Sequence, residues 1–216
     1  MGKIYLPLLF CLFLFASCSH RFVTQEIKDK TSNYVVDDQG KHINTMSLKL
    51  RGDSVITDTG SYPLTNVSAI KRGPAYYGVK NGDLYDCFYY GKLMVLGRYM
   101  GTVYNPQNKS FGSLYYYYLQ KQDAPEIVNL TDKNLIESVR DNPLALRKAK
   151  ASRIFSNVSI IAGITTVAGL SCIFLSDSSP IRKPAVTIGL FSMPTFLITL
   201  PIASHKRYKA IVVYNR

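Results

Sequence analysis

Residues 76–90 of the chain read YYGVKNGDLYDCFYY, and this stretch decides the fold class. Two runs rich in tyrosine, valine, leucine and phenylalanine flank the dipeptide Asn81-Gly82. Asn-Gly suits a two-residue type I′ turn, in which both central residues adopt positive φ and the flanking strands run antiparallel. The stretch therefore predicts a β-hairpin of residues 76–80 and 84–90.

Similar runs lie on both sides of this hairpin. Apolar and polar residues alternate over residues 46–50, and Arg51-Gly52-Asp53 then offers a turn. Further strand-like runs cover residues 62–70, 93–100, 113–120 and 127–130. Short strands with turn residues between them are typical of an antiparallel sheet. We expect an α+β protein with an antiparallel β domain over residues 41–130, built as a meander, a barrel or a sandwich.

Tyrosine is concentrated in this predicted domain, most densely in the run of Tyr115, Tyr116, Tyr117 and Tyr118. Successive side chains of a strand point to opposite faces of the sheet, so this run places rings on both faces. Two interpretations stay open. The rings pack against neighbouring strands, or they form an aromatic surface that binds a glycan, a peptide or a membrane interface.

The last third of the chain contains two uncharged apolar stretches, residues 154–175 and 184–203. Each is long enough to cross a bilayer as a helix, although Pro194 and Pro201 interrupt the second. We expect a two-helix hairpin over residues 154–203, either in a membrane or buried in a soluble protein. Connecting helices are expected over residues 131–153, beginning at the N-caps Thr131 and Asn142.

The N-terminal residues have the layout of an export signal. Lys3 precedes an apolar run and small residues, and this pattern predicts a signal peptide over residues 1–17. Phe15-Ala16-Ser17-Cys18 resembles a bacterial lipobox, which implies lipidation of Cys18 and a lipidated linker over residues 18–40. The alternative is an ordinary signal peptide followed by an incidental cysteine.

The distribution of charge along the chain indicates which kind of partner the basic residues contact. The chain holds 26 Lys and Arg against 14 Asp and Glu, a net charge of +12, and residues 147–216 alone carry ten cations and one Asp. Because these cations flank the apolar stretches and form a basic tail over residues 204–216, they predict contact with lipid headgroups and not with nucleic acid. The residues concerned are Arg147, Lys148, Lys150, Arg153, Lys206, Arg207 and Lys209.

The same cations conflict with the export signal. Export of the β domain would leave both basic flanks of the hairpin outside the cytoplasm, against the tendency of cations to stay inside. Three explanations stay open: the export signal overrides the tendency, the hairpin lies in another membrane or against protein, or the N-terminal segment is an uncleaved anchor. We favour the first.

The sequence contains few groups suited to catalysis. Its three histidines, His20, His42 and His205, are scattered, and Cys87 is the one cysteine of the predicted soluble part. Nucleotide-binding loops, zinc-binding helices and nucleophile elbows have no counterpart in the chain. We therefore expect a non-catalytic protein without cofactor or metal.

Taken together, these features resemble a group of uncharacterised exported lipoproteins of Bacteroidota. The matching text is Tyr116-Tyr117-Tyr118-Leu119-Gln120-Lys121, the helix start Asp141-Asn142-Pro143, and the ending Lys209-Ala210-Ile211-Val212-Val213-Tyr214-Asn215. The resemblance implies a location in the cell envelope and brings no activity with it. We expect a membrane-tethered β module that binds an envelope protein or organises a complex. An accessory subunit of a transport or secretion machine, or an enzyme acting on glycan or lipid, are the alternatives.

Overall fold

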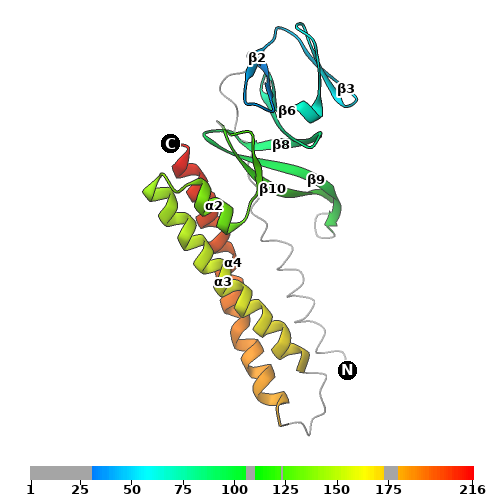
Figure 1. Ribbon diagram of the computed structural model, residues 1–216. Coiled ribbons are helices and arrows are strands. Elements are labelled where there is room, and N and C mark those ends of the chain that lie inside the picture. The colour runs from blue at the N-terminus through cyan, green and yellow to red at the C-terminus, as the bar shows by residue number, and fades with distance from the viewer. Residues whose placement is uncertain (1–30, 106–109, 123, 173–179) are drawn as a thin grey trace. The chain divides into compact units, whose positions relative to one another are not determined.

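The computed structural model describes residues 31–105, 110–122, 124–172 and 180–216 (Figure 1). The predicted signal peptide and Cys18 lie outside the described residues. The chain divides into two compact units: residues 31–138 and 214–216 belong to a β unit, and residues 139–213 to a helical unit. Each unit is considered by itself below.

The described part of the β unit contains a large antiparallel sheet of eight strands. They are β1 (Asn33–Asp37), β2 (His42–Asn44), β6 (Val67–Arg72), β7 (Ala75–Lys80), β8 (Asp83–Tyr89), β9 (Leu93–Asn105), β10 (Ser110–Lys121) and β11 (Ile127–Asn129). Their order is β11-β10-β9-β8-β7-β6-β1-β2, with every neighbouring pair antiparallel. The predicted antiparallel β domain is thus confirmed. The sheet also includes β1, which lies within the predicted linker of residues 18–40, because Val35 and Val36 pair with β6.

The hairpin predicted around Asn81-Gly82 is present between β7 and β8. Asn81 has φ of 55° and Gly82 has φ of 82°, as a type I′ turn requires, and Lys80 pairs with Asp83. Gly52, with φ of 55°, occupies a comparable turn between the paired residues Arg51 and Ser54. The Arg-Gly-Asp tripeptide thus belongs to an ordinary hairpin turn.

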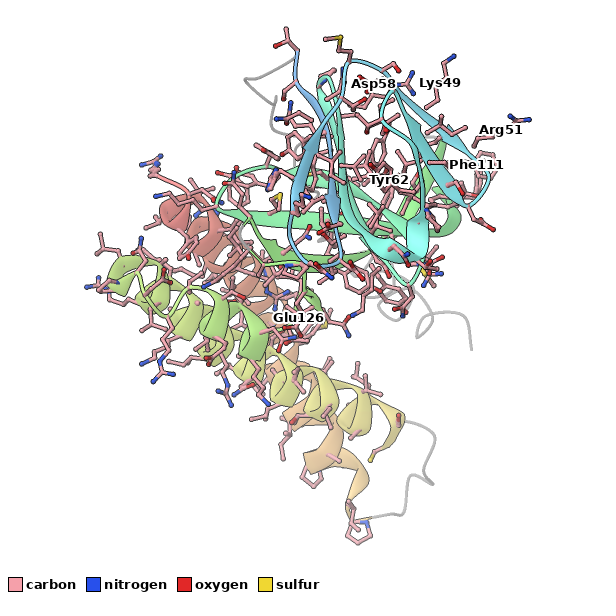
Figure 2. The ribbon with its side chains drawn as sticks, turned by 45° about the horizontal axis from the view of Figure 1, so that its top comes forward. Lys49, Arg51, Asp58, Tyr62, Phe111 and Glu126 are labelled. Carbon is pink, nitrogen blue, oxygen red and sulfur yellow. The ribbon has the colours of Figure 1, made fainter. Side chains whose placement is uncertain are left out.

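A second sheet of three strands covers part of one face of the large sheet. Its strands are β3 (Leu48–Arg51), β4 (Ser54–Thr57) and β5 (Ser61–Pro63), followed by the 3-10 turn η1 (Leu64–Asn66). The core between these layers consists of Val35, Leu48, Val55, Leu64, Val67, Ile70 and Val79, with Tyr62 and Tyr77 at its margin. Figure 2 shows Lys49 and Arg51 on the outer side of this small sheet and Tyr62 on its inner side.

The opposite face of the large sheet encloses a second core because the sheet curls. Val36, Ala69, Tyr76, Tyr85, Met94, Leu96 and Ile127 form this core. The Lys80 ammonium donates a hydrogen bond of 2.7 Å to the carbonyl oxygen of Ile127, which joins β7 to β11 although three strands lie between them in the sheet. A side chain at Gly78 would collide with Leu96 and Ile127, so glycine permits this closure.

The end of the chain completes the β unit at β9. The side-chain oxygen of Asn215 accepts a hydrogen bond from the backbone N–H of Leu93, and its amide nitrogen donates to the Leu93 carbonyl, both at 2.8 Å. One side chain thereby makes the pair of bonds that a neighbouring strand would make. The Lys121 ammonium lies 5.7 Å from the centre of the Tyr214 ring.

Three α-helices follow the strands in the described part of the chain: α2 (Asp132–Ser138), α3 (Pro143–Ser171) and α4 (Arg182–Tyr214). The predicted caps are confirmed, since Thr131 Oγ1 accepts from the N–H of Asn134 and Asn142 Oδ1 accepts from the N–H of Ala145, each at 3.1 Å. Contrary to the expected interruption, α4 continues through Pro194 and Pro201. Within the helical unit, α3 and α4 form the predicted packed hairpin.

Candidate functional site

The α3–α4 hairpin is built with its small residues inward. The buried residues of α3 are Ala145, Ala149, Ser152, Ser159, Ala162, Thr166 and Gly169, which recur at spacings of three, four or seven and so share one face. Large aliphatic side chains occupy the other faces, and Ile154, Ile161 and Ile164 are each more than 60% exposed. This pattern is the inverse of a helix in a water-soluble bundle.

Close contacts between small residues hold the two helices together. Ser152 Oγ donates a hydrogen bond of 3.1 Å to the carbonyl oxygen of Ala203, and the hydroxyls of Thr166 and Ser192 lie 2.8 Å apart. Nearer the connection between the helices, a Cβ on Gly169 would lie 2.6 Å from the Cα of Gly189, so the backbones touch there. Small residues commonly permit such close approach between membrane helices.

Polar residues of the hairpin are mostly satisfied within their own helices. The hydroxyls of Thr165, Ser171, Thr187 and Thr199 each donate to the carbonyl oxygen four residues earlier, at 2.7–2.9 Å. Among the described residues, Ser159 Oγ is the one buried side-chain oxygen or nitrogen without a hydrogen-bond partner. The polar side chains of the two spans therefore do not prevent burial in an apolar medium.

Both helices are long and apolar enough to cross a membrane. Their most apolar 18-residue windows have mean hydropathies of 1.6 and 1.8, and only 22% and 11% of those windows are buried. The core helix of a soluble protein would be mostly buried.

The predicted headgroup-contacting cations lie at one end of this hairpin. Arg147, Lys148, Lys150 and Arg153 lie on the first half of α3, and Lys206, Arg207 and Lys209 on the last half of α4. Because the helices are antiparallel, these halves share the open end, where Arg207 Nη2 lies 3.5 Å from Ser156 Oγ. The cations thus border the apolar part of the hairpin on the side away from the connection.

The predicted tyrosine run is divided between packing and exposure. Tyr115 and Tyr117 make edge-on contacts with Phe88, with ring centres 4.8 and 5.5 Å apart. Tyr118 packs beside Tyr85 against the inner core, with a ring-centre distance of 4.8 Å. Tyr116 is 60% exposed. Three of the four rings therefore pack within the sheet, and one is available to a partner.

A larger aromatic surface lies further along the same two strands. Among the described residues, β8 pairs with β9 only up to Gly97, so residues 98–105 and 110–116 form a two-stranded extension, here called the aromatic arm. Six of its large apolar side chains are at least half exposed: Tyr99, Met100, Tyr104, Phe111, Leu114 and Tyr116. Figure 2 labels Phe111, the most exposed of them at 73%. The sequence feature that could have revealed this arm is the presence of aromatic residues on both faces of two long strands.

A pocket of about 190 Å³ opens on the inner face of the curled sheet. Its wall includes Val36 of β1, His42 of β2, Tyr76 of β7 and Gln120 of β10. The Tyr76 hydroxyl donates to Gln120 Oε1 at 3.4 Å, and burial raises the pKa of Tyr76 far above its ordinary value, which keeps this hydroxyl protonated. Sequence reasoning missed the pocket, because its wall combines strands from both ends of the sheet.

Several other reactive side chains of the β unit are held by burial, by an ion pair or by hydrogen bonds. Asp83 forms an ion pair of 2.8 Å with Arg98, burial raises the pKa of the Asp86 carboxyl, and burial raises the pKa of the Cys87 thiol to about 12. The buried ammonium of Lys71 donates to Ser32 Oγ at 2.7 Å and to the Gly73 carbonyl at 3.1 Å, which ties β6 to neighbouring chain segments. Within the described ranges, no cluster of His, Cys, Asp and Glu side chains is suited to holding a metal ion.

Comparisons with protein-family models, with curated proteins and with solved structures found no match for this chain.

Proposed function

We propose that this chain is a non-catalytic protein of the bacterial cell envelope. The α3–α4 hairpin and a lipid on Cys18 hold it in a membrane, and its β domain binds a partner protein close to the bilayer. The observation that carries this proposal is the inverted hairpin, in which small and hydroxyl side chains meet between the helices while branched aliphatic ones face outward. Membrane lipids are accordingly its first partner.

The size of the exposed apolar surface supports a lipid environment for the hairpin. Ten large side chains of the two spans are exposed among the described residues: Ile154, Val158, Ile160, Ile161, Ile164, Val167, Ile188, Leu190, Phe191 and Ile198. Removing each from water contributes about 1 kcal/mol when roughly half of the side chain is still to be buried. The sum of about 10 kcal/mol equals the whole stability of an ordinary domain. A membrane recovers this free energy, whereas water does not.

The length and the charges of the hairpin agree with this assignment. Residues 154–171 rise about 27 Å along the helix axis, close to the roughly 30 Å of a hydrocarbon core. The cations at the open end then lie at the depth of the lipid phosphates. Only four residues, 139–142, separate α2 from α3 along the chain.

The aromatic arm is the proposed contact surface for an envelope protein. Aromatic residues and methionine are enriched in the buried centres of protein interfaces, and the arm exposes five such residues. At its base, Arg98 forms an ion pair with Asp83.

Membrane insertion is tested by extraction with alkaline carbonate. The wild-type chain should remain in the membrane pellet. Ile164→Arg places a charge in the middle of the span, which costs about 2.5–3.5 kcal/mol, and should shift most of the chain to the supernatant. Leu144→Arg is the control, because Leu144 is equally exposed, at 66%, but precedes the basic residues of α3. A wild-type chain in the supernatant, or equal retention of both variants, would reject the proposal.

Lipidation and orientation need their own measurements. Cys18→Ala should abolish palmitate labelling and leave the full-length precursor. Unchanged processing would reject the lipid anchor while leaving the hairpin in place. A tag placed before Arg147 should be digested by protease added to intact spheroplasts, because the export signal carries the β domain outward. A protected tag would reverse the proposed orientation.

A further inference from the structure

The pocket inside the curled sheet is independent of the hairpin and of the aromatic arm. The sheet curls until β1 and β2, at one end, face β10 across the interior. Val36 and Ala69 supply an apolar floor, and His42 and Gln122 stand exposed at the rim. The pocket is thus open to solvent at one side and lined by protein at the others.

Gln120 contributes a side-chain amide to the wall of this pocket. Its side chain is 97% buried, and its Oε1 already accepts from the Tyr76 hydroxyl. Gln120 is among the residues that line the pocket, and a side-chain amide nitrogen carries two N–H donors. Gly78 makes room for this arrangement, since a Cβ there would lie 3.2 Å from Gln120 Oε1. The amide therefore presents two N–H donors to whatever fills the pocket.

The described part of the lining favours a neutral ligand. Among the described residues that line the pocket there is no Lys, Arg, Asp or Glu. An ionic ligand would lose its hydration without gaining an opposite charge, which is strongly unfavourable. A neutral ligand with several hydroxyl groups fits better, because a hydroxyl can accept from the Gln120 amide while another donates to the side chains of Gln122 or His42.

The volume sets the size of the ligand. A space of about 190 Å³ holds about six waters at roughly 30 Å³ each, and it is smaller than the roughly 300 Å³ at which pockets for drug-sized molecules begin. We propose that the pocket binds one neutral sugar ring, such as a hexose or the terminal hexose of a glycan, through the Gln120 amide.

The binding experiment uses the full chain in lipid nanodiscs, because glucoside and maltoside detergents carry the chemistry under test. D-glucose, D-mannose and D-galactose are titrated and observed by saturation-transfer difference NMR. At least one should receive saturation from the protein, and D-glucuronate, which is the charged counterpart of glucose, should receive several-fold less. Absence of transfer to all three hexoses would overturn the proposal.

Two variants locate the binding. Gln120→Leu replaces the amide by an apolar group of similar size, and Gln122→Ala removes an exposed amide from the rim. Each should weaken hexose binding about tenfold, the factor that corresponds to 1.4 kcal/mol. Asn66→Ala is the control, since Asn66 is an exposed amide on η1 outside the pocket. Unchanged affinity in both glutamine variants would overturn the assignment, whether or not the chain is inserted in a membrane.

Discussion

At the scale of single residues, Cys87 shows how burial alone sets chemical behaviour. Its thiol donates to the carbonyl oxygen of Tyr89 at 3.4 Å, and burial raises its pKa to about 12. In the unfolded chain a cysteine titrates near pH 8.5. The thiol is therefore a packing group of the inner sheet face, and the thiolate needed for nucleophilic attack is scarce at neutral pH.

This pKa shift predicts alkaline destabilisation of the β domain. Between about pH 8.5 and pH 12 the unfolded chain releases the Cys87 proton while the folded domain retains it, so rising pH favours the unfolded state. The stabilising contribution is complete below pH 8.5. From pH 9 to pH 10 the free energy of unfolding should fall by about 1.4 kcal/mol, as measured by urea denaturation followed by tyrosine fluorescence.

The matched control for this prediction is Cys87→Ala, which removes the titrating group. Its stability should change far less than that of the wild type between pH 9 and pH 10. Above pH 10, Tyr76 adds a decline of the same sign in both proteins, since burial raises its pKa as well. Identical slopes for the two proteins below pH 10 would contradict the assignment to Cys87.

At the scale of elements, the sequence predicts local structure well and distant pairing poorly. Asn81-Gly82 predicts its hairpin because the turn depends on the φ preferences of two adjacent residues. β1 escapes prediction because its apolar run, Val35 and Val36, is short and gains its stability from pairing with β6 far along the chain. Alternation likewise assigns the tyrosines to two faces, but cannot tell which face another strand covers.

The pocket could not be predicted from the sequence either, because it also depends on contacts between residues that are far apart along the chain. Tyr76 and Gln120 are separated by 44 positions, and their hydrogen bond exists only because the sheet curls. No short pattern contains both residues. A buried glutamine at the end of an aromatic strand, with apolar Leu119 before it, is the one local sign of an internal polar site.

The hairpin allows a paired test of a hydrogen bond between its two helices. Ser152 and Ser159 lie on the same buried face of α3, at 0% and 2% exposure, but only the Ser152 hydroxyl has an acceptor on α4. Ser152→Ala should lower the stability of the hairpin by about 1 kcal/mol. Ser159→Ala removes an unsatisfied hydroxyl and should leave stability unchanged or raise it.

Stability of these two variants is compared by steric trapping or by titration with sodium dodecyl sulfate in mixed micelles. Because both substitutions remove one hydroxyl and keep the backbone, differences in helix propensity cancel. Equal destabilisation by the two substitutions would show that the contact between Ser152 and Ala203 contributes nothing specific.

At the scale of the whole molecule, the chain combines two units that suit different solvents. The β unit buries two cores of its own and keeps most of its charged side chains exposed to water. The helical unit leaves its large apolar side chains on the outside and packs small ones within. Most of the net charge of +12 is therefore carried by residues 147–216 and not by the sheet.

These different solvents predict two separate unfolding transitions for the full chain in lipid nanodiscs. Urea weakens hydrophobic burial in water, so the tyrosine signal in near-UV circular dichroism, which arises mainly from the β unit, should be lost at moderate urea. Helices within lipid satisfy their backbone hydrogen bonds internally and have no water to replace them. The helical signal at 222 nm should therefore persist after the near-UV signal has gone. Coincident loss of both signals would mean that the two units unfold as one, and would place the hairpin in water and not in lipid.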